Sequence, residues 1–178
     1  LEAAMTLGRD DFANLVMFTS LSKRSNVPGM RSGFVAGDAR GLEKFLLYRT
    51  YHGSAMSPTV QAASVAAWAD EAHVIENRRL YADKFAAVTP IVAAALSVSR
   101  PEAGFYLWAK VAGDDAVFSR ELLRQENVTV LPGSYLARTA QGSNPGAGYI
   151  RIALVAPLAE CVEAAERIAR FAANMAAS

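Results

Sequence analysis

Apolar positions in the first 72 residues form short blocks that suit alternating strands and helices. Apolar runs at residues 15–18 and 34–36 flank a polar loop, and helical patterns follow at residues 41–51 and 58–70. Strands that alternate with helices are typical of an α/β layer, and apolar runs without alternation predict strands buried on both faces. Residues 1–72 therefore predict an α/β domain.

After residue 72 the pattern changes to longer helices and strands that carry more aromatic residues. A long helix is expected over residues 73–96, and Pro90 should kink it because proline lacks the backbone donor. Strands are expected over residues 104–109, 128–131 and 149–154, and helices over residues 114–125 and 158–173. Residues 73–178 therefore predict an α+β domain, and the predicted fold class of the whole chain is α/β plus α+β.

Composition narrows the class of protein. The chain has 178 residues, of which 52% are hydrophobic and 20% charged, and this suits one or two small domains. A net charge of +1 lacks the basic excess of nucleic-acid-binding proteins, and no apolar run approaches the roughly eighteen residues that cross a bilayer. The one cysteine, Cys161, and the two histidines offer no metal-ligand cluster. We therefore expect a cytoplasmic protein without a nucleic-acid, membrane or metal partner.

The most informative chemistry lies in the polar loop, which reads Ser-Leu-Ser-Lys-Arg-Ser-Asn-Val-Pro-Gly-Met-Arg-Ser-Gly-Phe over residues 20–34. Arg31 follows Lys23 by eight residues, and Ser20 precedes that lysine by three. A guanidinium and a hydroxyl bind a phosphate, whereas a neutral lysine amine attacks an aldehyde carbon. Pyridoxal phosphate has both a phosphate and an aldehyde, so the loop predicts a binding site for this cofactor. The alternative is an ordinary basic surface loop.

Neighbouring residues of the loop agree with this interpretation. Nearby cations disfavour the charged form of a lysine, and Arg24 and Arg31 are the cations closest in sequence. Gly29 and Gly33 are expected to allow a close backbone approach or a positive φ around the phosphate.

Arg151 is the second candidate for anion binding. Strand alternation places it with Tyr149 and Ala153 on one face of the strand at residues 149–154. An arginine in an apolar strand is costly to bury unless an anion meets it. The alternative is a charge on an edge strand that discourages aggregation.

The pattern Ser-x-Ser-Lys followed by Gly-x-Arg-x-Gly-Phe resembles the class I/II aminotransferases of pyridoxal-phosphate fold type I. The resemblance implies that Lys23 carries pyridoxal 5'-phosphate, that Ser20 and Arg31 hold the phosphate, and that Arg151 binds the substrate α-carboxylate. It further implies a homodimeric transaminase that moves an amino group between glutamate and a keto acid, both small molecules.

The resemblance runs from near Leu1 to about Ala173, yet it covers only the C-terminal half of the family's architecture. It implies that residues 1–72 are the C-terminal portion of the large cofactor-binding domain and that residues 73–178 are the small domain. The family's earlier cofactor contacts are absent from the chain. We therefore expect an incomplete fragment that is inactive alone.

Two longer strings, residues 20–38 and Arg49–Pro58, resemble the succinyldiaminopimelate aminotransferases of bacterial lysine biosynthesis. This second resemblance implies N-succinyl-2-amino-6-ketopimelate as the amino acceptor. The alternatives are an aminotransferase of aspartate, aromatic or kynurenine type, a β-lyase, or a non-catalytic scaffold domain of the same fold.

Overall fold

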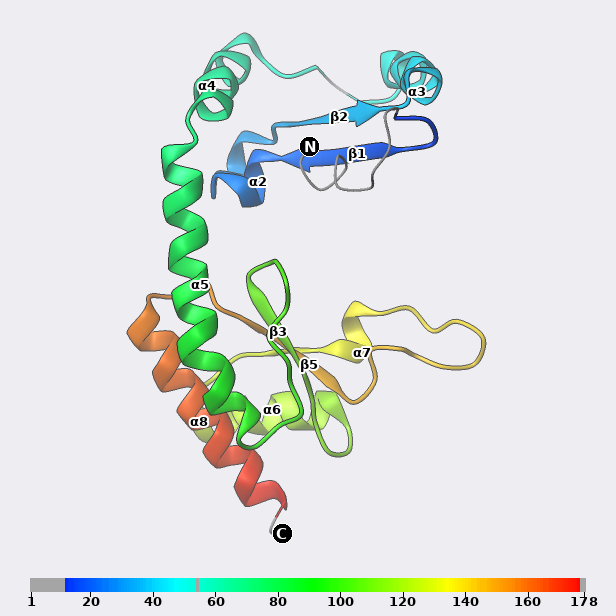
Figure 1. The fold of residues 1–178 in the computed structure, drawn as a ribbon. Coiled ribbons are helices and arrows are strands. Elements are labelled where there is room, and N and C mark those ends of the chain that lie inside the picture. The colour runs from blue at the N-terminus through cyan, green and yellow to red at the C-terminus, as the bar shows by residue number, and fades with distance from the viewer. Residues whose placement is uncertain (1–11, 54, 177–178) are drawn as a thin grey trace. The chain divides into compact units, whose positions relative to one another are not determined.

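The computed structural model describes residues 12–53 and 55–176, which belong to two compact units, Leu1–Asn77 and Arg78–Ser178 (Figure 1). Each unit has its own sheet and helices. The division falls inside helix α5 (Ala72–Ala93), whose first turns belong to the first unit. No helix in these described ranges is long and apolar enough to span a bilayer.

The first unit is built on an antiparallel hairpin. Strands β1 (Val16–Ser20) and β2 (Gly33–Gly37) pair with each other. Their connection contains the one-turn helix α2 (Leu21–Arg24) and the 3-10 turn η1 (Pro28–Met30). The hairpin therefore presents residues 21–32 as one loop at the end of its two strands.

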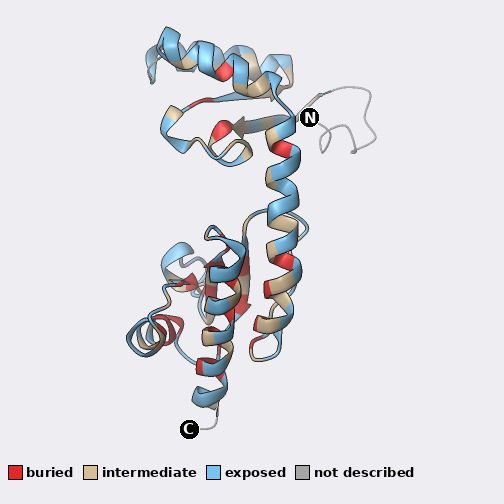
Figure 2. Ribbon diagram, turned by 90° about the vertical axis from the view of Figure 1, so that its left-hand side faces the viewer, coloured by how far each residue is buried: buried red, intermediate tan, exposed pale blue. Residues whose placement is uncertain are grey.

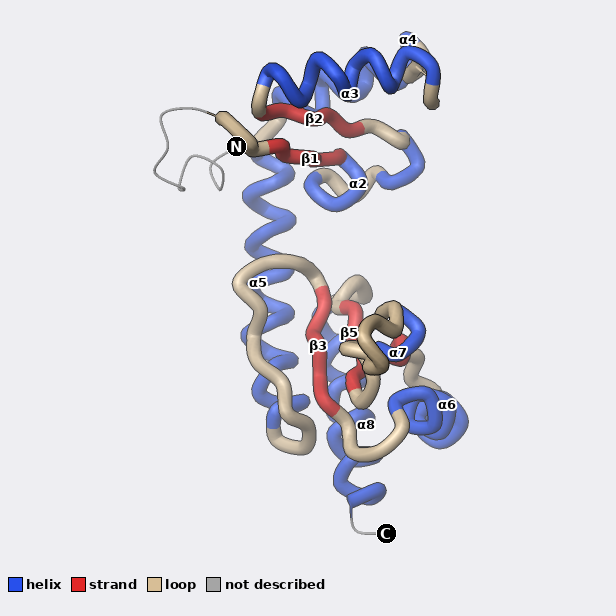
Figure 3. Tube along the Cα trace, turned by 90° about the vertical axis from the view of Figure 1, so that its right-hand side faces the viewer, coloured by secondary structure: helices blue, strands red, loops and turns tan. Residues whose placement is uncertain are grey.

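Two capped helices complete this unit. Helix α3 (Ala39–Tyr51) runs along β2, as Figure 3 shows, and helix α4 (Pro58–Ala69) follows it. The side chains of Asp38 and Ser57 accept hydrogen bonds from backbone N–H groups of the first turn of α3 and α4, respectively. Pro58 occupies the first helical position of α4, where its fixed φ suits a helix.

The expectation that both faces of these strands are buried is wrong for the part of the chain that the structure describes. Val16 and Phe18 of β1 are 44% and 68% exposed. Phe18 contacts Phe45 of α3 at a ring-centroid distance of 6.0 Å, yet most of its surface stays open. A hairpin with two short helices has too little apolar surface around it to cover both faces. Figure 2 shows how few buried residues this unit contains.

The second unit contains a three-stranded antiparallel sheet with the order β3-β5-β4. Its strands are β3 (Tyr106–Lys110), β4 (Leu131–Pro132) and β5 (Tyr149–Ala153). The helices are α6 (Asp115–Glu126), the one-turn α7 (Gly133–Leu136) and α8 (Leu158–Ala176), with the later turns of α5.

The core of this unit lies between one face of the sheet and three helices. Alternate residues of β3 and β5 face it, and α5, α6 and α8 contribute apolar side chains. Its members include Val88, Val92, Leu107, Ala109, Phe118, Leu122, Ile150, Ile152, Ile168 and Phe171, all at most 7% exposed. Cys161 of α8 is also buried there, and burial raises the pKa of its thiol.

Two predicted elements are shorter than expected. The strand predicted over residues 128–131 is only Leu131–Pro132, because Pro132 cannot donate to the ladder and α7 begins directly after it. Helix α5 continues through Pro90 and ends at Ala93, one turn later, rather than at residue 96.

Candidate functional site

The hairpin closes the polar loop at its base. Ser20 pairs with Gly33 across the two strands, and the Leu21 N–H donates to the Ser32 carbonyl at 3.1 Å. A Cβ atom on Gly33 would lie 2.5 Å from the backbone oxygen of Thr19, so only glycine fits there. The backbone thereby brings Ser20, Lys23 and Arg31 onto one closed loop.

Lys23 lies in the one-turn helix α2, where its side chain is exposed. Leu21 of the same turn is fully buried and anchors the helix to the unit. Ser20 occupies the N-cap position, yet its side chain makes no capping hydrogen bond. The hydroxyl of Ser20 is therefore not engaged as a helix cap, and it can serve as a donor to an anion.

Arg31 adopts a left-handed backbone conformation, with φ 52° and ψ 36°. That conformation costs a residue with a Cβ about 1–2 kcal/mol, and such strain is concentrated at functional sites. Its exposed guanidinium donates to the Pro28 carbonyl at 2.8 Å. The expectation for Gly29 is wrong in both forms, because the positive φ values in this loop fall on Asn26 and Arg31 and a Cβ atom on Gly29 would meet no atom within 4 Å. The expectation for Gly33 is confirmed as a close backbone approach.

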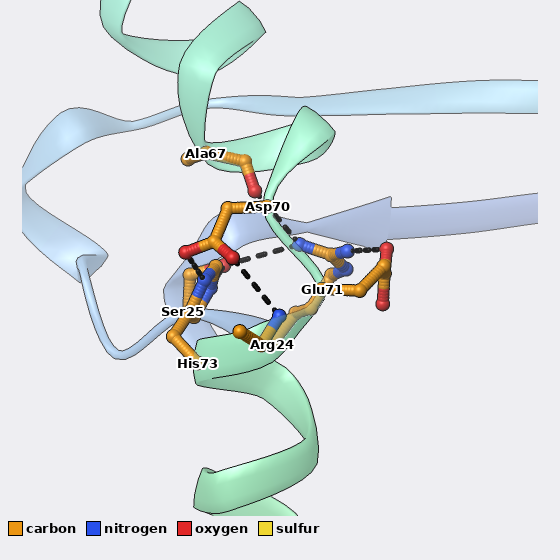
Figure 4. Close-up of polar contacts among 7 residues, drawn as sticks. Arg24, Ser25, Ala67, Asp70, Glu71 and His73 are labelled. Atoms are coloured by element: carbon orange, nitrogen blue, oxygen red, sulfur yellow. Dashed lines mark hydrogen bonds and ion pairs between the residues drawn. The ribbon is translucent and has the colours of Figure 1, made fainter.

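Arg24 contacts α4 and the residue directly before α5 (Figure 4). Its guanidinium donates to the Ala67 carbonyl at 3.0 Å, lies 4.8 Å from the ring centroid of Trp68 and forms an ion pair with Glu71. Glu71 compensates the charge of Arg24, and the expectation that Arg24 acts as a cation toward Lys23 stays a prediction. These contacts connect the loop to α4.

Arg151 belongs to the second unit and lies on β5, the central strand of the sheet. It pairs with Trp108 of β3 on one side and with Leu131 of β4 on the other. The alternative of an edge-strand charge is therefore wrong for the described sheet.

The surroundings of Arg151 suit an anion. Its guanidinium lies 5.4 Å from the ring centroid of Tyr106, and its Nε is buried without a hydrogen-bond partner among the described residues. A buried donor without a partner is costly, and a carboxylate would satisfy it. The side chains that share its face of the sheet include Trp108 and Tyr149, which stack at 5.6 Å.

Asp115 is a residue that the sequence analysis missed. It is 4% exposed, and its carboxylate accepts hydrogen bonds from the Ser134 N–H at 2.8 Å and the Gly148 N–H at 3.1 Å. Burial by itself raises the pKa of Asp115, but the hydrogen bonds from Ser134 and Gly148 outweigh it and hold that pKa below its usual range. Asp115 thus fixes the chain directly before the strand that carries Arg151.

Comparison with known proteins decides the family. The family model for class I and II aminotransferases matches residues 3–168. The chain belongs to the class I and II aminotransferases. A probable aminotransferase of Mycobacterium tuberculosis is 37% identical over 147 residues, which are 82% of this chain and 34% of that protein.

Solved structures of aminotransferases share the fold. An aminotransferase from Neisseria meningitidis has 61% identity and a TM-score of 0.84 over 94% of this chain and 42% of its own. A probable N-succinyldiaminopimelate aminotransferase from Thermus thermophilus has 28% identity and a TM-score of 0.76 over 92% of this chain and 43% of its own. The predicted fold class, part of a pyridoxal-phosphate-dependent transferase, is thereby confirmed. The chain spans less than half the length of each of these proteins.

Membership of this family implies pyridoxal phosphate as the cofactor, and the described loop fits it. Arg31 and Ser20 offer charged and neutral donors for a phosphate, and Lys23 offers an amine for an aldehyde. Gly33 allows the base of the loop to close, because a side chain at this position would collide with the backbone of Thr19.

Proposed function

We propose that the intact protein is a pyridoxal-phosphate-dependent aminotransferase, and that this chain supplies its reactive lysine, part of its phosphate site and its carboxylate-binding arginine. The observation that carries the proposal is the closed hairpin loop: Ser20 ends β1, and Lys23 and Arg31 lie in the loop between the two bonded strands. The family match supports the same chemistry for that loop.

In this proposal each residue of the loop has one task. Arg31 and Ser20 hold the phosphate through charge-assisted and neutral hydrogen bonds. Bound pyridoxal phosphate supplies an electron sink for the substrate α-carbon. Lys23 binds the cofactor and, once released, moves the proton from that α-carbon as a general base and then a general acid.

Arg151 orients the substrate. Its buried Nε lacks a partner among the described residues, and a substrate α-carboxylate would supply two acceptor oxygens. The ring of Tyr106 beside the guanidinium limits where that carboxylate can lie. A fixed carboxylate leaves the substrate α-carbon in one orientation for the proton transfer.

For the substrate, we propose glutamate as the amino donor and N-succinyl-2-amino-6-ketopimelate as the acceptor, as in lysine biosynthesis. The resemblance of residues 20–38 and 49–58 to succinyldiaminopimelate aminotransferases supports this choice, as does the Thermus thermophilus relative. The second candidate is an aminotransferase of aspartate, aromatic or kynurenine type.

The proposal includes a homodimer in the cytoplasm. In it residues 1–72 complete the large cofactor-binding domain, and residues 73–178 form the small domain. Its activity requires the segments that the relatives have beyond the matched part.

Absorbance and acceptor profiling test the proposal. The intact protein with added pyridoxal phosphate should show the band of a lysine Schiff base, and Lys23→Ala should lack it. With glutamate as donor, N-succinyl-2-amino-6-ketopimelate should be aminated faster than oxaloacetate or phenylpyruvate. No band would exclude the aminotransferase, whereas a band with a different preferred acceptor would change only the substrate.

A further inference from the structure

The three residues that follow the candidate lysine contact the last turn of α4, the segment that joins α4 to α5, and the start of α5. Arg24 contacts Ala67, Trp68 and Glu71, as described above. The Ser25 hydroxyl lies 2.8 Å from Nε2 of His73, and the side-chain amide of Asn26 donates to that of Asn77 at 2.8 Å. Residues 24–26 therefore attach the loop to α5 and to the last turn of α4.

The contact through Ser25 continues to Asp70, which holds the imidazole ring of His73. Nδ1 of His73 lies 2.7 Å from Oδ2 of Asp70, whose other oxygen accepts from the Ala72 N–H at 2.9 Å (Figure 4). The hydrogen bond to His73, with that of the Ala72 N–H, lowers the pKa of Asp70, so its carboxylate is ionised at neutral pH. A carboxylate accepts only, and Nδ1 of His73 therefore donates to it. In the neutral ring Nε2 then accepts from the Ser25 hydroxyl.

In many hydrolases a serine, a histidine and a buried aspartate are connected in the same order, and the serine acts as a nucleophile. Here the side chain of Asp70 is 54% exposed and that of His73 is 33% exposed. Water can reach both groups, and Arg24 also donates to the Ser25 hydroxyl at 3.4 Å. The arrangement therefore suits a fixed connection better than nucleophilic catalysis.

The lysine needs such a connection. Its helix, α2, is a single turn, and single turns are unstable without tertiary contacts. Leu21 anchors the beginning of that turn, and the residues after the lysine anchor its end. Because reaction rates fall steeply when a reacting group is misplaced by about 1 Å, the end of the turn affects the lysine directly.

We propose that His73 is a positioning residue for Lys23, acting through Ser25 and held in orientation by Asp70. This inference rests on the proposed function. The start of α5 thereby fixes the loop that carries the reactive amine, without contact between His73 and the reacting atoms.

Variants of the intact protein, loaded with pyridoxal phosphate, test this role. We expect His73→Ala and Ser25→Ala to form the Schiff-base band, to shift the pH midpoint of its titration, and to lower kcat roughly ten- to hundredfold. KM for glutamate should change less than kcat, because binding of the carboxylate is assigned to Arg151. Ser25→Thr retains the hydroxyl and should restore both the midpoint and kcat.

Asp83→Asn is the matched control, because it removes only an exposed ion pair with Arg79 on the same helix. This control should keep the wild-type midpoint and kcat. If His73→Ala and Ser25→Ala keep both values as well, the positioning role is excluded. If His73→Ala does not fold, the comparison of Ser25→Ala with Ser25→Thr decides by the same two readouts. A wild-type protein without the band would instead exclude the proposed function.

Discussion

Replacing Asp115 by asparagine should destabilise the second unit by an amount that its two hydrogen bonds define. The carboxylate accepts from the Ser134 N–H at 2.8 Å and the Gly148 N–H at 3.1 Å. An asparagine offers one acceptor oxygen and one amino group, so one of these two N–H groups would face a donor. A buried group left without its partner costs about 1–3 kcal/mol, and we expect the free energy of unfolding to fall by about 2 kcal/mol.

Urea unfolding measures this loss if tryptophan fluorescence reports on the second unit alone. The chain has two tryptophans, and Trp108 stacks on Tyr149 within that unit. In a Trp68→Phe background Trp108 is the only tryptophan. With a urea m-value of about 2 kcal/mol/M, the unfolding midpoint should fall by about 1 M.

Asp114→Asn is the matched control, because it makes the same chemical change one residue earlier. Asp114 is exposed and caps α6 by accepting from the Ala116 and Val117 N–H groups. Asparagine caps a helix as well as aspartate does, so this variant should keep the wild-type midpoint. Equal midpoints for Asp114→Asn and Asp115→Asn would refute the reasoning.

The pH dependence gives a second check of the same reasoning. The pKa of Asp115 is lowered in the folded chain, so its contribution to stability is complete above the unfolded value of about 3.9. That contribution is lost as the pH falls from there through the folded pKa. The stability difference between wild type and Asp115→Asn should therefore be constant from about pH 5 to 8 and shrink below about pH 4. A difference that stays constant down to pH 3 would contradict the assigned charge.

Three further variants test the loop and the sheet. Arg31→Gly should raise the free energy of unfolding by about 1 kcal/mol, because it relieves the left-handed strain, while weakening cofactor binding in a pyridoxal phosphate titration. A fall in stability would contradict the strain. Gly33→Ala should lower the free energy of unfolding in urea by more than about 2 kcal/mol, because the new Cβ atom would collide with the Thr19 carbonyl. A variant with wild-type stability would show that the base of the loop can open. Arg151→Lys should raise KM for glutamate at least about tenfold and lower kcat in steady-state kinetics, with cofactor absorbance unchanged, because lysine lacks the planar fork. Equal loss of cofactor would assign Arg151 to the cofactor instead.

Local patterns predicted much of the fold. Helical periodicity anticipated α3, α4, α6 and α8, and strand alternation anticipated that Arg151 and Ile152 face opposite sides of β5. The loop at residues 20–34 was recognisable because its residue types and spacing are local in sequence.

These local patterns could not predict contacts between residues that are far apart in the sequence. Asp115 reads as an ordinary residue in the first turn of α6, and its partners follow it by 19 and 33 residues. The ion pair of Arg24 with Glu71 was not predicted, because the two residues are 47 positions apart in the sequence. The strand predicted over residues 128–131 depended on β-propensity, but the ladder is limited by Pro132 and the turn of α7.

Reductive trapping tests the central assignment most directly. Borohydride reduction of the intact protein with pyridoxal phosphate, followed by peptide mass mapping, should place the pyridoxyl group on the peptide that contains Lys23. The label should be absent from Lys44, Lys84 and Lys110. A label on one of these other lysines, or no label on Lys23 in a protein that aminates keto acids, would contradict the account.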